Sequence, residues 1–189
     1  GIHGGEQGAQ HSQALHSWYA HIPGLRVVMP ATADDARDLL IAATLCDDPV
    51  LYIDDRWCYE QTAEVAPAGP VDLTVQGPKV RRAGADISVV AASYSVKLAM
   101  DAAELLAKRN ISAEVVDLRV LNPLDHGVST ASVKKTGRLL AVDGGWATCG
   151  LAGEIIAGVA EALPPSALRA RPRRITLPDS PAPTSKLLE

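Results

Sequence analysis

The sequence has few aromatic residues, few cysteines and no long hydrophobic run. Its 189 residues include no phenylalanine, three tryptophans and four tyrosines. The three cysteines, Cys46, Cys58 and Cys149, are widely spaced and form no CxxC pair, so neither a disulfide framework nor a typical zinc site is indicated. No apolar run approaches the roughly 20 residues of a membrane-spanning helix. The opening GIHGGEQGAQ has neither the basic start nor the apolar stretch of a signal peptide.

Positive charge is not in excess either. The formal net charge is −4 at pH 7 and the isoelectric point is near 5.7, so the sequence lacks the electrostatic signature of a nucleic-acid-binding protein. Together with the cysteine pattern, this predicts a cytoplasmic protein with neither a nucleic acid nor a membrane as partner. The mitochondrial matrix or a plastid stays open for a eukaryotic source.

Strand patterns and helix patterns alternate along the chain. The predicted strands cover residues 25–30, 50–54, 86–93, 112–121, 138–145 and 173–179, and the predicted helices cover residues 33–46, 95–110, 126–137 and 151–163. Thr32 is expected to cap the first helix, with Asp35 completing a capping box, and Ser95 to cap the second. Strands that alternate with helices predict an α/β fold with mostly parallel sheets and flanking helices.

The chain divides into two unequal parts in this prediction. Residues 60–79 are rich in proline and small residues and lack a helical period, which favours a linker between domains. Residues 1–59 supply only two strands and one helix, too little to bury a core alone. We therefore expect the first domain to be completed by sequence before Gly1 or by a partner chain. Residues 80–189 would form the second domain.

Three of the five histidines lie in the stretch GEQGAQHSQALHSWYAH. His11, His16 and His21 are five positions apart, so on a helix successive side chains would point about 140° apart and could not share one metal ion. A neutral imidazole in a loop could accept or donate a proton near pH 7, whereas a lone histidine is more often structural. His11 is the candidate for the chemical role, and His16 and His21 are assigned to packing or to the surface.

Other motifs carry weaker signals. The glycines in DGGWATCGLAG are not spaced as GxGxxG, so Gly144, Gly145 and Gly150 are expected to shape a tight turn and a helix start. Neither a GxSxG motif nor an activated-cysteine pattern is present. Asp54 and Asp55 are adjacent, and neighbouring carboxylates in a strand point to opposite faces. A solvated loop is therefore expected there.

An ordered series of motifs makes the sequence recognisable. The stretch GAQHSQALHSWYAHIPGLRVVMP, followed by DDARDLL, GPKVRRAGADISVVAASYSV, EVVDLRVLNPLD, LLAVDGGW, GLAGEI and the tail SPAPTSKLLE, closely resembles the beta subunit of thiamine-diphosphate-dependent 2-oxo acid dehydrogenases. This is the decarboxylating component of the pyruvate and branched-chain complexes. The resemblance covers essentially the whole chain, and the order of the motifs makes it specific.

The resemblance implies a fold and a set of site residues. Residues 1–59 would be the back part of a pyrimidine-binding domain, and residues 80–189 a transketolase C-terminal domain. His11 would be catalytic: it would line a site between alpha and beta subunits, help to bind the 2-oxo acid and handle protons during acyl transfer. Ser12 and Gln13 would be its active-site neighbours. A K⁺ site built largely from backbone carbonyls would map onto Ala43, Thr44, Cys46 and Asp48.

The resemblance also implies parts that this chain does not carry. The glutamate that activates thiamine diphosphate would lie before Gly1, and the motif for the diphosphate and Mg²⁺ would belong to the alpha subunit. The chain alone should therefore be inactive. Its expected partners are the alpha subunit, the lipoyl acyltransferase and a second beta subunit, in a heterotetramer. Acetoin dehydrogenase or another transketolase-type enzyme is an alternative, and so is a non-catalytic assembly module.

Overall fold

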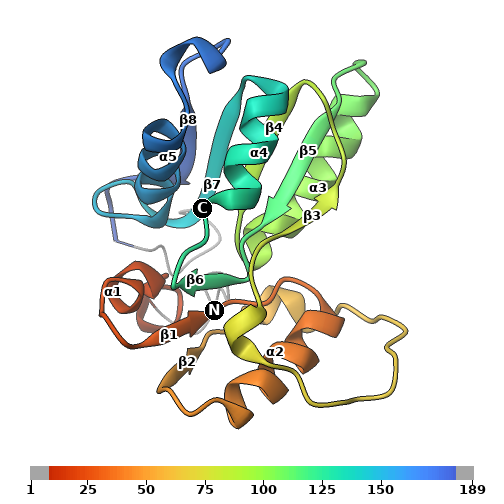
Figure 1. Cartoon of the computed structure of the whole chain (residues 1–189), viewed down its shortest axis with the longest axis vertical. Helices are drawn as coiled ribbons and strands as arrows, with labels where there is room; N and C mark the ends of the chain where they lie inside the picture. Colours follow the sequence, from red (N-terminus) through yellow and green to blue (C-terminus); the bar gives the residue numbers. More distant parts are fainter. Residues whose placement is uncertain (1–8, 182–189) are drawn as a thin grey trace.

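The computed structural model describes residues 9–181, which form two sheets with helices packed around them (Figure 1). The smaller sheet has the strand order β2-β1-β6 and the larger sheet the order β3-β5-β4-β7-β8. The strands are β1 (Arg26–Val28), β2 (Val50–Tyr52), β3 (Lys79–Arg82), β4 (Ile87–Ala91), β5 (Ala113–Asp117), β6 (Val120–Asn122), β7 (Leu139–Trp146) and β8 (Arg173–Leu177). The helices are α1 (His16–Ala20), α2 (Ala33–Leu45), α3 (Tyr94–Ala107), α4 (Gly127–Thr136) and α5 (Leu151–Ala162). The predicted α/β class is confirmed.

Helices cover both faces of the larger sheet. Val89, Ala91 and Val115 pack with α3 on one face, whereas Val90, Val116 and their neighbours pack with α4 and α5 on the other. Because both faces are buried, β4 is a nearly continuous apolar run instead of an alternating one. The strands β5, β4, β7 and β8 are parallel to their neighbours in the sheet, and only the edge strand β3 runs antiparallel.

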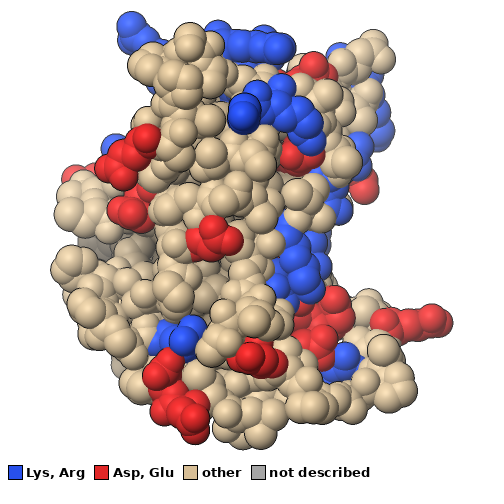
Figure 2. Space-filling model, viewed as in Figure 1, with Lys and Arg blue, Asp and Glu red and all other residues tan. Residues whose placement is uncertain are grey.

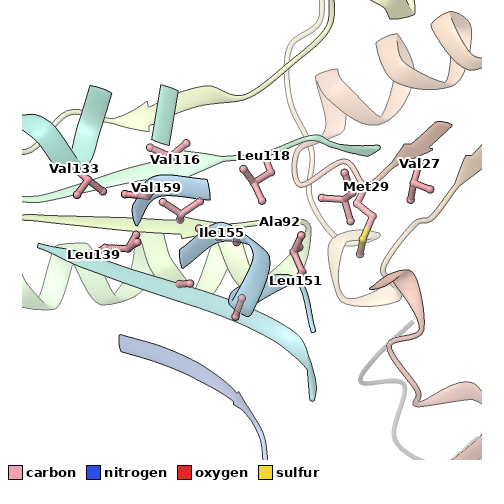
Figure 3. Close-up of a cluster of buried hydrophobic side chains, with 14 of the residues drawn as sticks. Val27, Met29, Ala92, Val116, Leu118, Val133, Leu139, Leu151, Ile155 and Val159 are labelled. Atoms are coloured by element: carbon pink, nitrogen blue, oxygen red, sulfur yellow. The ribbon is translucent and has the colours of Figure 1, made fainter. Parts of the chain in front are cut away.

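The predicted strand over residues 112–121 is two strands that belong to different sheets. β5 lies inside the larger sheet, and β6 pairs antiparallel with β1 in the smaller one. Between them Arg119 has a φ of 61°, and its backbone N–H donates to the Asp117 carboxylate over 3.1 Å. Positive φ is uncommon outside glycine, so this residue makes a sharp change of direction. As a result, one hydrophobic cluster continues from Val116 and Leu118 to Val27 and Met29 (Figure 3).

A buried ion-pair cluster joins the two sheets beside this crossing. The Asp35 side chain, fully buried on α2, accepts from Arg119 Nε and Nη2 over 2.8 Å each, from Arg81, and from Lys79 Nζ over 3.1 Å. Arg119 also donates to the Gln76 side chain over 3.0 Å. In Figure 2 basic and acidic side chains meet at the narrow waist beside β3. Asp35 thus serves as an ion-pair partner, and the capping-box prediction is wrong: Thr32 makes no side-chain capping bond.

The structure also differs from several local predictions. Strand β3 was not predicted, and it begins inside the segment expected to be a linker. Ser95 lies within α3, and the N-cap position belongs to Ser93. Gly144 and Gly145 lie in β7 instead of a tight turn, whereas Gly150 is at the start of α5 as expected. Within residues 9–181 no helix is long and apolar enough to cross a membrane.

The connection between β3 and β4 has no room for a side chain at Gly84. A Cβ there would lie 2.2 Å from backbone atoms of Ala113 and Glu114, so Gly84→Ala must displace β3 or β5. We expect a loss of about 1–3 kcal/mol in the free energy of unfolding, measured by urea denaturation. Gly69→Ala is the matched control, because nothing lies within 4 Å of its Cβ position. Equal stability of the two variants would contradict this packing.

Candidate functional site

The predicted catalytic histidine lies just before α1, in the short 3-10 helix η1 (Ala9–His11). The side chains of His11 and Gln13 are exposed, whereas Ser12 between them is buried. Gln13 lines a cavity of about 190 Å³ between α1 and the ends of β1 and β2, which we call the small cavity. His11 is therefore exposed at the surface, two residues before a residue that lines the small cavity. Its catalytic role, and the roles of Ser12 and Gln13, stay predictions.

The helix that follows His11 is anchored to β7 and to α5 by two consecutive residues. His16 is buried, and its Nε2 lies 2.9 Å from Oδ1 of Asp143 on β7. Ser17 Oγ accepts a hydrogen bond of 3.1 Å from the backbone N–H of Leu151, at the first turn of α5. The sequence assigned His16 to packing or to the surface. The structure confirms the packing and adds a carboxylate partner that the sequence did not indicate.

The Asp143 carboxylate is buried and accepts three hydrogen bonds. Besides His16, the backbone N–H groups of Gly145 and Ala152 donate to it over 2.9 and 3.2 Å. Burial by itself raises the pKa of Asp143, but the hydrogen bond from His16, the charge of His16 and the two N–H groups together lower it below its usual value. The carboxylate therefore stays an ionised acceptor that fixes both α1 and the start of α5.

This arrangement predicts how acid affects stability. Because the folded-state pKa of Asp143 is lowered, its contribution is complete above the unfolded value of about 3.9 and is lost as the pH falls through the folded value. Asp143→Asn should cost roughly 1–3 kcal/mol at pH 5, and the difference from the unmodified chain should shrink below about pH 4. Urea unfolding between pH 5 and pH 2.5 measures both curves. A difference that does not change with pH would contradict the ionised carboxylate.

The adjacent carboxylates of Asp54 and Asp55 lie in different surroundings. Asp54 is exposed and accepts a hydrogen bond from the Tyr59 hydroxyl. Asp55 is only 2% exposed, and its Oδ1 accepts from the backbone N–H of Trp57 over 3.0 Å. The prediction of a solvated loop is therefore wrong for Asp55. Both residues line the small cavity together with Gln13 and His16.

The third histidine of the cluster faces a different hollow. His21 lines a cavity of about 970 Å³ between α1, the segment after β6 and the start of α5, where His126 and Arg174 also lie. These three histidines therefore lie in three settings: His11 is exposed in a short 3-10 helix, His16 is in a buried contact with Asp143, and His21 is in the wall of a large cavity. Among residues 9–181 no group of three or more His, Cys, Asp or Glu side chains is placed to hold a metal ion.

The residues of the expected K⁺ site lie at the end of α2 and just after it. The Asp48 carboxylate accepts from Arg26 Nε over 2.7 Å, and the Thr44 hydroxyl donates to the Leu40 carbonyl over 2.8 Å. Cys46 is half-buried, and Ala43 lies in the last turns of the helix. A cation bound by carbonyl oxygens here stays a prediction, and it would have to share the Asp48 carboxylate with Arg26.

Comparison with known proteins finds two families matched in succession along the chain. Residues 77–189 match the family described as "Transketolase, C-terminal domain", and residues 1–59 match "Transketolase, pyrimidine binding domain". The chain is 42% identical over 185 residues to the mitochondrial pyruvate dehydrogenase E1 component subunit beta-1 of Arabidopsis thaliana. It is 41% identical over 181 residues to the acetoin:2,6-dichlorophenolindophenol oxidoreductase subunit beta of Cupriavidus necator. These alignments cover 96% of this chain but only 51% and 53% of the relatives, so the chain spans about half their length.

Solved structures share the fold. A split-gene transketolase, solved as an inactive beta4 tetramer, superimposes with a TM-score of 0.69 and 26% identity over 91% of this chain and 55% of its own. Transketolase from Campylobacter jejuni has a TM-score of 0.61 at 14% identity, over 93% of this chain and 25% of its own. Two transketolase domain families match the chain in succession, and solved transketolases share its fold. The chain therefore belongs to the transketolase family, with residues that match its pyrimidine-binding and C-terminal domains.

Proposed function

We propose that the chain is the C-terminal part of the beta subunit of a thiamine-diphosphate-dependent 2-oxo acid dehydrogenase. The whole enzyme would decarboxylate a 2-oxo acid and transfer the acyl group to the lipoyl-lysine of an acyltransferase. The observation that carries the proposal is the position of His11: its side chain is exposed, two residues before Gln13, which lines the small cavity, and the next helix is anchored to β7 and α5 through His16 and Ser17. An exposed imidazole close to an anchored helix suits proton transfer to a bound substrate.

We assign the metal of the cofactor to another part of the enzyme, because the resemblance places the motif for the diphosphate and Mg²⁺ in the alpha subunit. The part proposed for this chain is therefore limited to its own side chains. His11 would exchange a proton with the substrate, and Ser12 and Gln13 would shape the wall next to it. The diphosphate, Mg²⁺ and the activating glutamate are assigned to the alpha subunit and to the preceding part of the beta subunit.

The proposed assembly is a heterotetramer of alpha and beta subunits that docks on a lipoyl acyltransferase. Within this chain we propose residues 1–59 and 80–189 as two domains, joined by residues 60–79. We also propose K⁺ as a bound ion. The similarity to an acetoin oxidoreductase beta subunit supports acetoin as the alternative substrate. Eukaryotic relatives are named as mitochondrial proteins, so a mitochondrial location is proposed for a eukaryotic source and a cytoplasmic one otherwise.

Reconstitution tests this proposal. The 189-residue chain with thiamine diphosphate and Mg²⁺ should not decarboxylate pyruvate. Adding an alpha subunit and joining the chain to the preceding half of a beta subunit should restore decarboxylation and reductive acylation of a lipoyl domain. Activity of the chain alone would refute the assignment of the missing parts. A complete assembly that binds the cofactor but neither a 2-oxo acid nor acetoin would favour the non-catalytic assembly module.

A further inference from the structure

The larger sheet is strongly basic at the end that lies away from the smaller sheet (Figure 1). Residues 162–178 contain four arginines and no aspartate or glutamate. Three of them, Arg169, Arg171 and Arg173, are exposed and lie just before β8 or at its first residue. We call these three residues the arginine group. Figure 2 shows basic side chains gathered at this end of the molecule, at the top of the view.

Packing brings further positive charge next to the arginine group. The backbone N–H of Arg169 donates to the Gly137 carbonyl over 2.7 Å, and a Cβ at Gly137 would lie 2.5 Å from Cγ of Arg169. Arg169 is thus held against the turn between α4 and β7. Lys134 lies in the last turn of α4, and Arg138 directly precedes β7. The positive charge at this end therefore comes from three neighbouring parts of the fold.

The charge of the arginine group is not compensated within the described residues. No ion pair in residues 9–181 involves any of its three side chains. The nearby Lys135, by contrast, pairs with Glu114, and the basic residues of the cluster at the waist pair with buried Asp35. Uncompensated like charges at one surface attract an anionic partner.

Strand β8 is also an edge of the larger sheet. It pairs with β7 on one side, with Arg173 opposite Leu140 and Ile175 opposite Val142, and no strand within residues 9–181 pairs with its other side. Ile175 is 56% exposed. Since side chains alternate along a strand, Arg173 and Ile175 share one face. An edge strand also has unpaired backbone N–H and C=O groups, to which an added strand can bind.

These features distinguish between the possible partners. A second copy of β8 would supply arginines instead of carboxylates, so the positive charge would stay uncompensated. A nucleic acid would pair with the arginines but would leave the backbone groups of β8 and the exposed Ile175 unused. An extended peptide with acidic and apolar side chains satisfies all three, because carboxylates form strong hydrogen bonds with guanidinium groups.

We propose that the free edge of β8 and the arginine group form a docking site for a partner protein, which adds an extended acidic segment as the next strand of the larger sheet. Carboxylates of this segment pair with Arg171 and Arg173, and an apolar residue of it packs on Ile175. The backbone of the segment forms hydrogen bonds with the backbone of β8. The site uses neither the cofactor nor His11, so it is independent of the proposed enzymatic function.

Titration of the capped peptide Val-Glu-Glu-Glu-Glu-Val, which carries a fluorescent label of no net charge, with the 189-residue chain tests the site. Its fluorescence anisotropy should rise to saturation, and added salt should weaken binding because it screens the charges. A control peptide keeps four glutamates but separates them by prolines. It should bind weaker by about fivefold or more, because proline cannot donate to a strand. Amide hydrogen exchange in β8, followed by NMR, should slow with the first peptide only.

Variants locate the binding surface. The double variant Arg171→Gln, Arg173→Gln removes two exposed charges and should bind the peptide about tenfold weaker. Arg56→Gln is the matched control: Arg56 is also exposed but lies in the 3-10 helix η2 (Arg56–Cys58), so its loss should change binding by less than about twofold.

Four results would each overturn the proposal. They are the absence of saturable binding, equal binding of the proline-separated peptide, unchanged binding in the double variant, and tighter binding of a short single-stranded DNA than of the peptide. The last result would assign the arginine group to nucleic acid instead of an acidic protein segment.

Discussion

Replacing His11 with alanine in the reconstituted enzyme should lower acyl transfer by about 10²–10⁴-fold, the usual contribution of a side chain that transfers a proton. Its imidazole is exposed, whereas the helix behind it is anchored by His16 and Ser17. The substitution should therefore remove the proton-transfer group without unfolding its support. Cofactor binding should stay close to normal, because the diphosphate and Mg²⁺ are assigned to other parts of the enzyme. Single-turnover transfer to a lipoyl domain and a separate titration of the cofactor measure the two effects.

His21→Ala is the matched control for His11. His21 is also exposed and lies just after the end of α1, where it lines the cavity of about 970 Å³. We expect its substitution to change turnover by less than a few-fold. Unchanged turnover in His11→Ala would remove His11 from the site. An equal loss in both variants would point to a general disturbance of α1.

The largest loss of stability is expected at Arg119. Arg119→Ala should lower the free energy of unfolding by about 3–5 kcal/mol, because it takes away two of the hydrogen bonds to the fully buried carboxylate of Asp35 and leaves only Arg81 and Lys79 to pair with it. Arg119 is itself only 2% exposed and also contacts Gln76 and the Gly77 carbonyl. Urea denaturation of the 189-residue chain measures the effect. If Arg119→Ala does not fold, Arg119→Lys should show a smaller loss, since it keeps the charge but not the two-pronged geometry.

Arg26→Ala is the control for Arg119→Ala, because it removes an ion pair that is exposed instead of buried. Arg26 also pairs with an aspartate, Asp48, over 2.7 Å, but the Asp48 side chain is 52% exposed. Surface pairs of this kind contribute at most about 1 kcal/mol. If Arg119→Ala loses no more free energy of unfolding than Arg26→Ala, the ion-pair cluster at Asp35 does not stabilise the contact between the two sheets.

What could be predicted from the sequence was local, and what could not depended on distant partners. The strands and helices could be predicted from the apolar pattern within each segment, such as the continuous run of Val89, Val90 and Ala91 in β4. Asp35 looked like a capping residue because the pattern around Thr32 is local, whereas its partner Arg119 lies 84 positions away. The break between β5 and β6 depends on one residue with a positive φ, which no periodicity marks. β3 was missed because its alternation is short and its side chains are mostly basic.

The candidate site was predicted through resemblance more than through chemistry. His11 has no partner pattern in the sequence that distinguishes it from other histidines. The contact between His16 and Asp143 spans 127 positions, so spacing could not reveal it. One signal was available: Asp143 sits inside an otherwise apolar strand, and a charge there needs a partner. Asp55 offered a similar signal, because an aspartate two positions before Trp57 is a common turn-capping pattern.

The antiparallel pairing of β6 with β1 also has a consequence for how the chain folds. Val27 pairs with Asn122 and Val28 with Val120, so the smaller sheet cannot be completed until residues near 122 have left the ribosome. Contacts this far apart in sequence slow folding, because a long loop must close before they form. The first segment should thus remain without its third strand while most of the larger sheet is synthesised. During that interval the free edge of β1 is open to pairing with another nascent chain.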